Sequence, residues 1–312
     1  MKQGLLLRKG SPEAKDDERI AHAWGFWLPE ASLHFWTKNA PYVRDESAAA
    51  RRIKDALLVA PQPKIFKSVK GGDSFRLPSQ NFPNSEFVRV LLARKTHRHF
   101  RKQSLSLESV SRLLSLVWGV TGYIHSPRFG KLLRKTSPSG GGRHPGEVYL
   151  MALRVKGLRR GLYYYHPSHH RLDRISTPAT PTRAWQYCAR QQFVKNAAAL
   201  FLMTAVFPRT IWKYRHPRAY RVVLLETGHL CQTFCLVATW LGLAPFCTAA
   251  LNDLLIEKDL GIDGIHESVL YVAGVGYPNT AEHPAHSVNR ALGHEHHHRR
   301  NLAFRIGERV TR

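Results

Sequence analysis

Residues 136–150 have the sequence TSPSGGGRHPGEVYL, in which a polar, glycine-rich stretch leads directly into an apolar one. Consecutive glycines allow the backbone to turn, and they also expose N–H and C=O groups that a flat ligand can approach closely. The stretch has neither the GxGxxG spacing of a dinucleotide-binding loop nor the GxxxxGK[ST] spacing of a phosphate-binding loop. Taken alone, it is compatible with a plain turn and with the edge of a ligand site, so the segments around it have to decide.

The flanking segments alternate between helical and extended patterns. Apolar residues recur with helical spacing after Ser106, a good N-cap, and the pattern stops at Gly119, which predicts a helix. Residues 148–155 and 197–206 are short, evenly apolar runs typical of buried strands, and 161–175 has the pattern of a hairpin. Further patterns predict a long helix over 219–242, a strand at 245–250, a helix at 253–260 and a last strand at 267–275. Together they predict an α+β fold.

The two ends of the chain differ from this central part. Residues 1–80 are charged, then aromatic in 24-WGFWLPEASLHFWTKNAPY-42, and we expect an irregular arm that packs its aromatic residues on a neighbouring surface. Residues 281–312 are basic and His-rich, and a solvated tail is favoured over a metal site there. The predicted division is an N-terminal segment over 1–80, a central domain over 81–280 and a tail over 281–312.

Composition limits the class of protein. The 312-residue chain is 43% hydrophobic and carries a net charge of +25, which indicates a globular protein and favours nucleic acid, anionic lipid or an acidic peptide as partner. Nucleic acid is disfavoured, because the aromatic residues do not alternate with the basic ones. We expect a soluble, cytoplasmic protein that does not span a membrane, because no apolar run reaches the roughly 18 residues of a membrane span and no signal peptide is recognisable.

The four cysteines are Cys188, Cys231, Cys235 and Cys247, and they form no CxxC pair. In a chain of this length they indicate buried thiols in a reducing compartment. Cys231 and Cys235 lie on one face of the predicted long helix. Packing is the favoured interpretation, because a metal site would need further ligands nearby, and no metal site is predicted.

Two segments carry groups suited to binding or catalysis. In 89-RVLLARKTHRHFRK-102 a dense set of cations surrounds Thr96, and a solvated basic helix face and a phosphate site are equally compatible with it. In 211-IWKYRHPRAYR-221, Lys213 and Tyr214 are adjacent. Composition alone favours a solvated turn there, although Lys and Tyr both act as bases where a site lowers their pKa.

The order of these segments resembles the SagB-type dehydrogenases, a branch of the flavin-dependent nitroreductase superfamily. The matching strings are TSPSGGGRHPGEVYL, GLYYYHPSHHRLDRI, ARKTHRHF for an early Arg-Arg-Ser-x-Arg element, WKYRHPRAYR, ETGHLCQ on a long helix and the closing ESVLYVAGVGYP. SPSGG-x-RHP is the most specific of them. In the early element, Lys95 replaces the second Arg of the family and Thr96 replaces its Ser.

The resemblance implies a nitroreductase-like fold with a central, mostly antiparallel sheet flanked by helices, and a homodimer that binds FMN at its interface. It implies that Arg94, Thr96 and Arg98 hold the FMN phosphate and ribityl chain. It implies further cofactor contacts from Pro138, Ser139, Gly140 and Gly141 at the isoalloxazine ring and from Gly274 and Gly276 near the phosphate end. Lys213 and Tyr214 match the pair to which the family's base role is assigned.

The activity implied by the resemblance is the oxidation of azolines to azoles in a ribosomally made peptide. The Cβ hydride would go to flavin N5, the Cα proton to Lys213 or Tyr214, and oxygen would reoxidise the flavin. The implied partners are the precursor peptide and a cyclodehydratase, and the basic surface would dock an acidic leader peptide or partner enzyme. Two alternatives remain open: an NAD(P)H-dependent reductase of nitro or quinone compounds, and a basic nucleic-acid-binding protein without catalysis.

Overall fold

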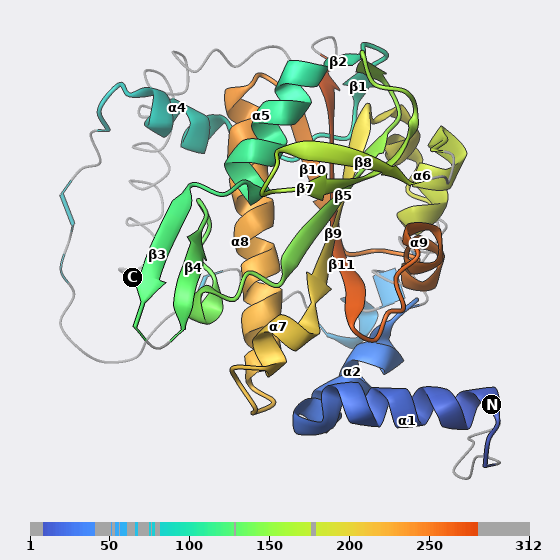
Figure 1. Cartoon of the computed structure of the whole chain (residues 1–312). Coiled ribbons are helices and arrows are strands. Elements are labelled where there is room, and N and C mark those ends of the chain that lie inside the picture. The colour runs from blue at the N-terminus through green and yellow to red at the C-terminus, as the bar shows by residue number, and fades with distance from the viewer. Residues whose placement is uncertain are drawn as a thin grey trace, which may run out of the picture.

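The computed structural model describes residues 9–40 and 82–279, except residue 128 and residues 176–178, together with isolated positions between 51 and 78 (Figure 1). The helices are α1 (Pro12–Trp24), α2 (Leu28–Thr37), α4 (Glu86–Ala93), α5 (Leu107–Trp118), α6 (Pro181–Tyr187), α7 (Phe207–Ile211), α8 (Ala219–Trp240) and α9 (Asp253–Leu260), with short 3₁₀ turns η1 (Gly25–Trp27), η2 (Gly140–Gly142) and η3 (Gln192–Asn196). The strands are β1 (Phe100–Arg101), β2 (Leu105–Ser106), β3 (Gly122–Ser126), β4 (Gly130–Arg134), β5 (Gly146–Ala152), β6 (Val155–Lys156), β7 (Gly161–His166), β8 (Arg171–Ile175), β9 (Ala199–Val206), β10 (Ala244–Thr248) and β11 (Glu267–Pro278).

A seven-stranded sheet forms the centre of the described part of the chain. Its order is β1-β11-β9-β5-β7-β8, and β10 pairs with β11 beside β1. Every pairing in this sheet is antiparallel, which confirms the predicted sheet type. Every residue of β5 is buried, and so are all but the last of β9, as expected for strands that are covered on both faces.

Helices cover the two faces of the sheet (Figure 1). One apolar cluster joins the sheet to α5 and α8, and a second joins it to α6, η3 and α9. In α5, Ser106 Oγ accepts a hydrogen bond from the Ser109 amide at 3.0 Å, as its predicted N-cap role requires. The length and composition of α8 alone would let it cross a membrane, but one of its faces is buried against the sheet, and a core helix explains the same composition.

The N-terminal segment is helical over residues 12–37, so the prediction of an irregular arm was wrong there. Ser11 caps α1 by accepting a hydrogen bond from the Ala14 amide at 3.1 Å, and a proline stands in the first turn of both α1 and α2, where it starts a helix instead of breaking it. The predicted aromatic packing is confirmed for Trp24 and Trp27, which are fully buried against α7 and the start of α8, whereas Trp36 is exposed. Most of residues 41–81, and the predicted tail 281–312, lie outside the described residues.

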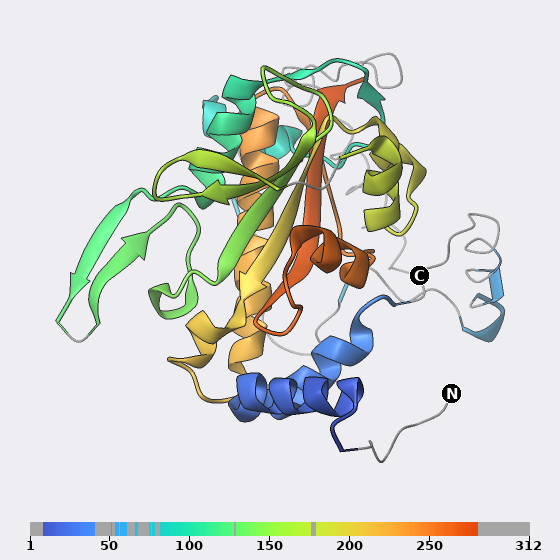
Figure 2. The same cartoon turned by 45° about the vertical axis from the view of Figure 1, so that its right-hand side comes forward.

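The hairpin of β3 and β4 was not predicted. It projects from the body of the molecule in both views (Figures 1 and 2). Most of its residues are exposed, so no alternation of buried and exposed side chains marks it in the sequence. The glycine-rich loop follows this hairpin and connects β4 to β5.

Candidate active site

The glycine-rich loop between β4 and β5 has a backbone that requires glycine. Gly141 and Gly142 have φ angles of +62° and +65°, in the left-handed region. Ser139 Oγ accepts a hydrogen bond from the His144 amide at 2.8 Å, and the Ser139 carbonyl accepts one from the Gly142 amide at 3.1 Å. The loop is therefore a fixed turn held by its own hydrogen bonds.

Lys213 and Tyr214 follow α7 and converge on this loop from 72 residues away in sequence. Their amides donate to the Thr210 carbonyl at 3.1 and 2.9 Å, and the Tyr214 carbonyl accepts the indole N–H of Trp27 at 2.9 Å. Lys213 Nζ donates to the Gly141 carbonyl at 3.2 Å. A Cβ atom on Gly141 would lie 2.6 Å from Lys213 Nζ and would clash with the Tyr214 hydroxyl. The two side chains thus meet at the loop that was predicted to contact the flavin ring.

The surroundings of the pair combine aromatic faces with cations. Lys213 Nζ lies 4.5 Å from the ring centroid of Phe129, and the Arg143 guanidinium lies 4.8 Å from that of Trp212. Lys213 and Tyr214 are both half-buried. A partly desolvated ammonium beside a phenol can move a proton or hold developing negative charge.

A buried polar network supports the loop from behind, and sequence reasoning missed its members. Glu226 on α8 accepts a hydrogen bond from the Gly146 amide at 3.4 Å, and burial raises the pKa of its carboxyl. Arg209 Nη1 donates to the His144 carbonyl at 2.9 Å and also contacts the carboxylate of Glu147. Burial lowers the pKa of His144, whose Nε2 lies 3.1 Å from the Leu133 carbonyl. The available signal was a lone acid, Glu226, on the apolar face of a helix.

The predicted phosphate-binding residues lie in a different part of the structure from the glycine-rich loop. Helix α4 ends at Ala93, so the cations from Arg94 onward stand on an extended segment and do not form the helix face considered above. The His97 amide donates to the Pro245 carbonyl at 2.9 Å, and the Arg98 guanidinium lies 5.8 Å from the ring centroid of Phe193. Arg94 is half-buried, whereas Thr96 and Arg98 are exposed.

The predicted cofactor glycines of β11 have a packing role in the structure. A Cβ atom on Gly274 would lie 2.8 Å from Leu200 Cδ2 and would overlap the ring of Phe246, and one on Gly276 would lie 2.9 Å from the Phe100 ring. Both glycines are buried. Close packing of aromatic rings on the strand therefore accounts for them, and a contact with a cofactor stays a prediction.

The two halves of the predicted site lie toward opposite ends of α8 (Figure 1). Gly140 packs on Val222 in the first turn of α8, because its Cβ would overlap that side chain. Pro245, which holds the Arg94–Arg98 segment, follows the last turn of α8 at Trp240. At 1.5 Å per residue, the stretch from Val222 to Trp240 is roughly 27 Å long. The structure thus brings Lys213 and Tyr214 to the glycine-rich loop but leaves the cationic segment far from it.

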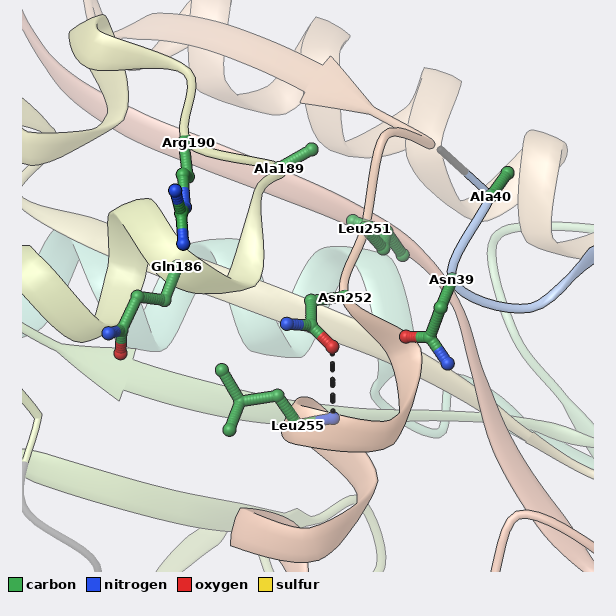
Figure 3. Close-up of a pocket in the computed structure, with 8 residues that line it drawn as sticks. All are labelled: Asn39, Ala40, Gln186, Ala189, Arg190, Leu251, Asn252 and Leu255. Atoms are coloured by element: carbon green, nitrogen blue, oxygen red, sulfur yellow. Dashed lines mark hydrogen bonds between the residues drawn. The ribbon is translucent and has the colours of Figure 1, made fainter. Parts of the chain in front are cut away.

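A pocket lies between the end of α2, the end of α6 and the start of α9 (Figure 3). Asn252 Oδ1 caps α9 there by accepting a hydrogen bond from the Leu255 amide at 3.4 Å. The pocket encloses about 180 Å³, less than the roughly 300 Å³ at which ligand pockets usually begin. None of the predicted site residues lines it.

Similarity to known proteins covers most of the central domain. A family model described as "Nitroreductase family" matches residues 91–277. The Trifolitoxin-processing protein TfxB of Rhizobium leguminosarum bv. trifolii is 34% identical over 170 residues, 53% of this chain and 46% of that protein. The Microcin B17-processing protein McbC of Escherichia coli is 30% identical over 168 residues, 52% of this chain and 58% of that protein. The chain thus spans about half the length of these curated relatives.

A solved structure supports the fold. The E. coli microcin synthetase McbBCD complex with truncated pro-MccB17 bound contains a chain with a TM-score of 0.54 and 22% sequence identity, and the match covers 86% of this chain and 94% of that one. The family match includes the glycine-rich loop, the Lys213–Tyr214 pair and the complete central sheet apart from the last residue of β11. With its antiparallel sheet, its flanking helices and this match, the chain belongs to the nitroreductase family.

Proposed function

We propose that this chain is an FMN-dependent dehydrogenase of the SagB type that matures a ribosomally made peptide by oxidising azolines to azoles. The observation that carries the proposal is the meeting of Lys213 and Tyr214 with Gly141 at one point of the fold. Two relatives named as processing proteins for trifolitoxin and microcin B17 support a peptide as the substrate.

The residues present fit a flavin. At Gly141, Lys213 Nζ and the Tyr214 hydroxyl occupy the space where a Cβ would lie, so both polar groups lie directly against the loop that is proposed to meet the ring. Arg94 and Arg98 offer guanidinium groups that suit a phosphate, and Thr96 offers a hydroxyl. Bound FMN would supply the acceptor for the substrate hydride.

Within the pair, we assign the proton transfer to the Tyr214 hydroxyl. Lys213 Nζ is already hydrogen-bonded to the Gly141 carbonyl, whereas no partner of the Tyr214 hydroxyl is found among the described residues. The two polar atoms lie within about 5 Å of each other, since both crowd the same Cβ position at Gly141. We therefore assign the transfer of the acidic Cα proton of an azoline to the Tyr214 hydroxyl, with the Lys213 ammonium close enough to hold developing negative charge.

A homodimer would reunite the two halves of the site. A two-fold axis that crosses α8 places the first turns of one α8 beside the last turns of its partner, and with them the glycine-rich loop beside the Arg94–Arg98 segment. Leu224 and Leu225 are exposed on α8 in the single chain, and such an arrangement would cover them. The proposed FMN site therefore lies between two protomers.

The proposed partners follow from charge and substrate class. An acidic leader segment of a precursor peptide, or a cyclodehydratase that acts before this enzyme, would be attracted to a chain with a net charge of +25. The charge has no role in the oxidation itself. It would act on the association rate and would weaken with salt.

The proposal is tested with Lys213→Ala and Tyr214→Phe. Both variants should purify with FMN that is released on denaturation, and their turnover of an azoline-containing peptide should fall by roughly 10²- to 10⁴-fold, as for the loss of a general base. Lys195→Ala is the matched control: Lys195, in η3, packs on Trp185 of α6, and its loss should not affect turnover. Full activity in both site variants would refute the assignment, and rapid NADH oxidation in place of azoline oxidation would favour the reductase alternative.

A further inference from the structure

Three of the four cysteines come together in the tertiary structure. Cys231 and Cys235 lie one turn apart on α8, and Cys247 comes from β10. Their sulfur atoms all lie within 4.8 Å of one another. Cys188 belongs to the apolar cluster on the other face of the sheet. Cys247 is the further sulfur ligand whose position beside Cys231 and Cys235 could not be predicted from the sequence.

The arrangement of the sulfurs matches a metal site. With metal–sulfur bonds of about 2.3 Å, trigonal or tetrahedral coordination places sulfur atoms about 3.8 to 4.0 Å apart. The observed cluster therefore needs shifts of less than about 1 Å to bind an ion. All three thiols are free, and they are carried by a helix and a strand of the rigid core.

The surroundings of the cluster combine burial of two sulfurs with a polar contact at the third. Cys231 and Cys235 are only 3% and 6% exposed, while Cys247 is partly exposed and gives an ion a way in. The Tyr271 hydroxyl donates a hydrogen bond to Cys247 Sγ at 3.2 Å. This hydrogen bond would offset part of the negative charge that three thiolates place around one ion.

We infer that Cys231, Cys235 and Cys247 form a trithiolate site for one thiophilic d¹⁰ cation, Zn²⁺ or Cu⁺. Thiolate sulfur selects these two ions among the common metals. Binding exchanges three S–H protons, which are released to solvent, for three metal–sulfur bonds, and no electron is transferred. The ion would tie the last turns of α8 to β10. The site uses neither the glycine-rich loop nor the Lys213–Tyr214 pair, and metal binding to it can be measured without any assay of the proposed oxidation.

Metal titration of the full, reduced, chelator-stripped chain tests this inference without any activity assay. Co²⁺ serves as the probe, because ligation by thiolates produces an intense charge-transfer band that His ligands, including those of 294-HEHHH-298, do not produce. The band should saturate at one equivalent of Co²⁺, and one equivalent of Zn²⁺ should abolish it. A second arm with Cu⁺ under anaerobic conditions determines which ion binds more tightly.

Substitutions locate the site. Cys247→Ser and Cys231→Ala should lose the band, whereas Cys188→Ser, which removes a buried thiol on the other face of the sheet, should keep it. Circular dichroism of each variant without metal checks that it has folded. Zn²⁺ should also raise the unfolding midpoint of the unmodified chain by several degrees and leave that of folded Cys247→Ser unchanged. Absence of the band in the unmodified chain, or its survival in folded Cys247→Ser, would overturn the inference.

Discussion

Gly141→Ala tests whether the loop and the Lys213–Tyr214 pair form one site. Gly141 has a φ of +62°, and an added methyl group would lie 2.6 Å from Lys213 Nζ and would overlap the Tyr214 hydroxyl. To reach an ordinary van der Waals separation, the ammonium has to withdraw by roughly 1 Å and the phenol by a similar distance. The substitution therefore displaces both proposed catalytic groups without removing either.

The substitution should lower both the stability of the fold and the turnover. An alanine in the left-handed region costs about 1 to 2 kcal/mol, and loss of the Lys213 hydrogen bond to the Gly141 carbonyl adds about 1 kcal/mol. A displacement of about 1 Å at the reacting groups lowers the rate roughly 10²-fold. The variant should thus unfold at a urea concentration lower by roughly 1 M and lose about 99% of its turnover of an azoline-containing peptide.

Gly142→Ala is the matched control for this prediction. Its φ of +65° imposes the same backbone strain, but its added methyl group would meet only Leu132, at an ordinary distance of 3.8 Å. Urea denaturation should show a loss of about 1 to 2 kcal/mol for Gly142→Ala, with turnover within a few-fold of the unmodified chain. Equal turnover in the two variants would refute the reasoning, because backbone strain would then account for the whole effect.

Two further predictions concern association and pH. Leu225→Glu should dissociate the proposed dimer in sedimentation experiments and release FMN, because Leu225 is 62% exposed on α8 at the proposed interface. Leu254 is equally exposed on α9, and Leu254→Glu should have neither effect. A dimer that survives Leu225→Glu would contradict the proposed interface. His34 is stacked on Trp24, and burial lowers its pKa to about 3, so below about pH 6.5 the unfolded chain takes up a proton that the folded chain does not. Its contribution to stability is complete above pH 6.5 and is lost as the pH falls toward 3, at up to about 1.4 kcal/mol per pH unit. Urea denaturation from pH 7 to pH 4 should show a steeper loss than in His34→Gln, and parallel curves would contradict this assignment.

Local patterns predicted most of the core elements. The helix after Ser106, the buried strands β5 and β9 and the hairpin of β7 and β8 are all present within a few residues of their predicted limits. Their patterns were strong because each element buries a defined face, and periodicity records that face directly. The β3–β4 hairpin and helices α1 and α2 were missed for the opposite reasons: the hairpin buries little, and the prolines that begin the two helices also occur at loop boundaries.

The site was predicted in pieces, and its residue identities came from a resemblance in segment order. Composition alone favoured a solvated turn for Lys213 and Tyr214, and the glycines alone were compatible with a plain turn. The structure changes this because α7 and the loop before β5 meet at the first turns of α8. The positioning role of Glu226 could not be recognised, because its partner is a backbone amide 80 residues away.

The sequence by itself determined where the helices and strands with a buried face form, where glycines let the backbone turn, and which reactive groups are neighbours along the chain. Only the tertiary structure decided which distant groups meet: Lys213 with Gly141, and Cys247 with the two thiols of α8. The physical reason is that short-range periodicity reports burial of a face but not its partner. Partners are selected by the order of strands in the sheet and by the packing of one long helix across it, and both depend on contacts between residues far apart in the chain.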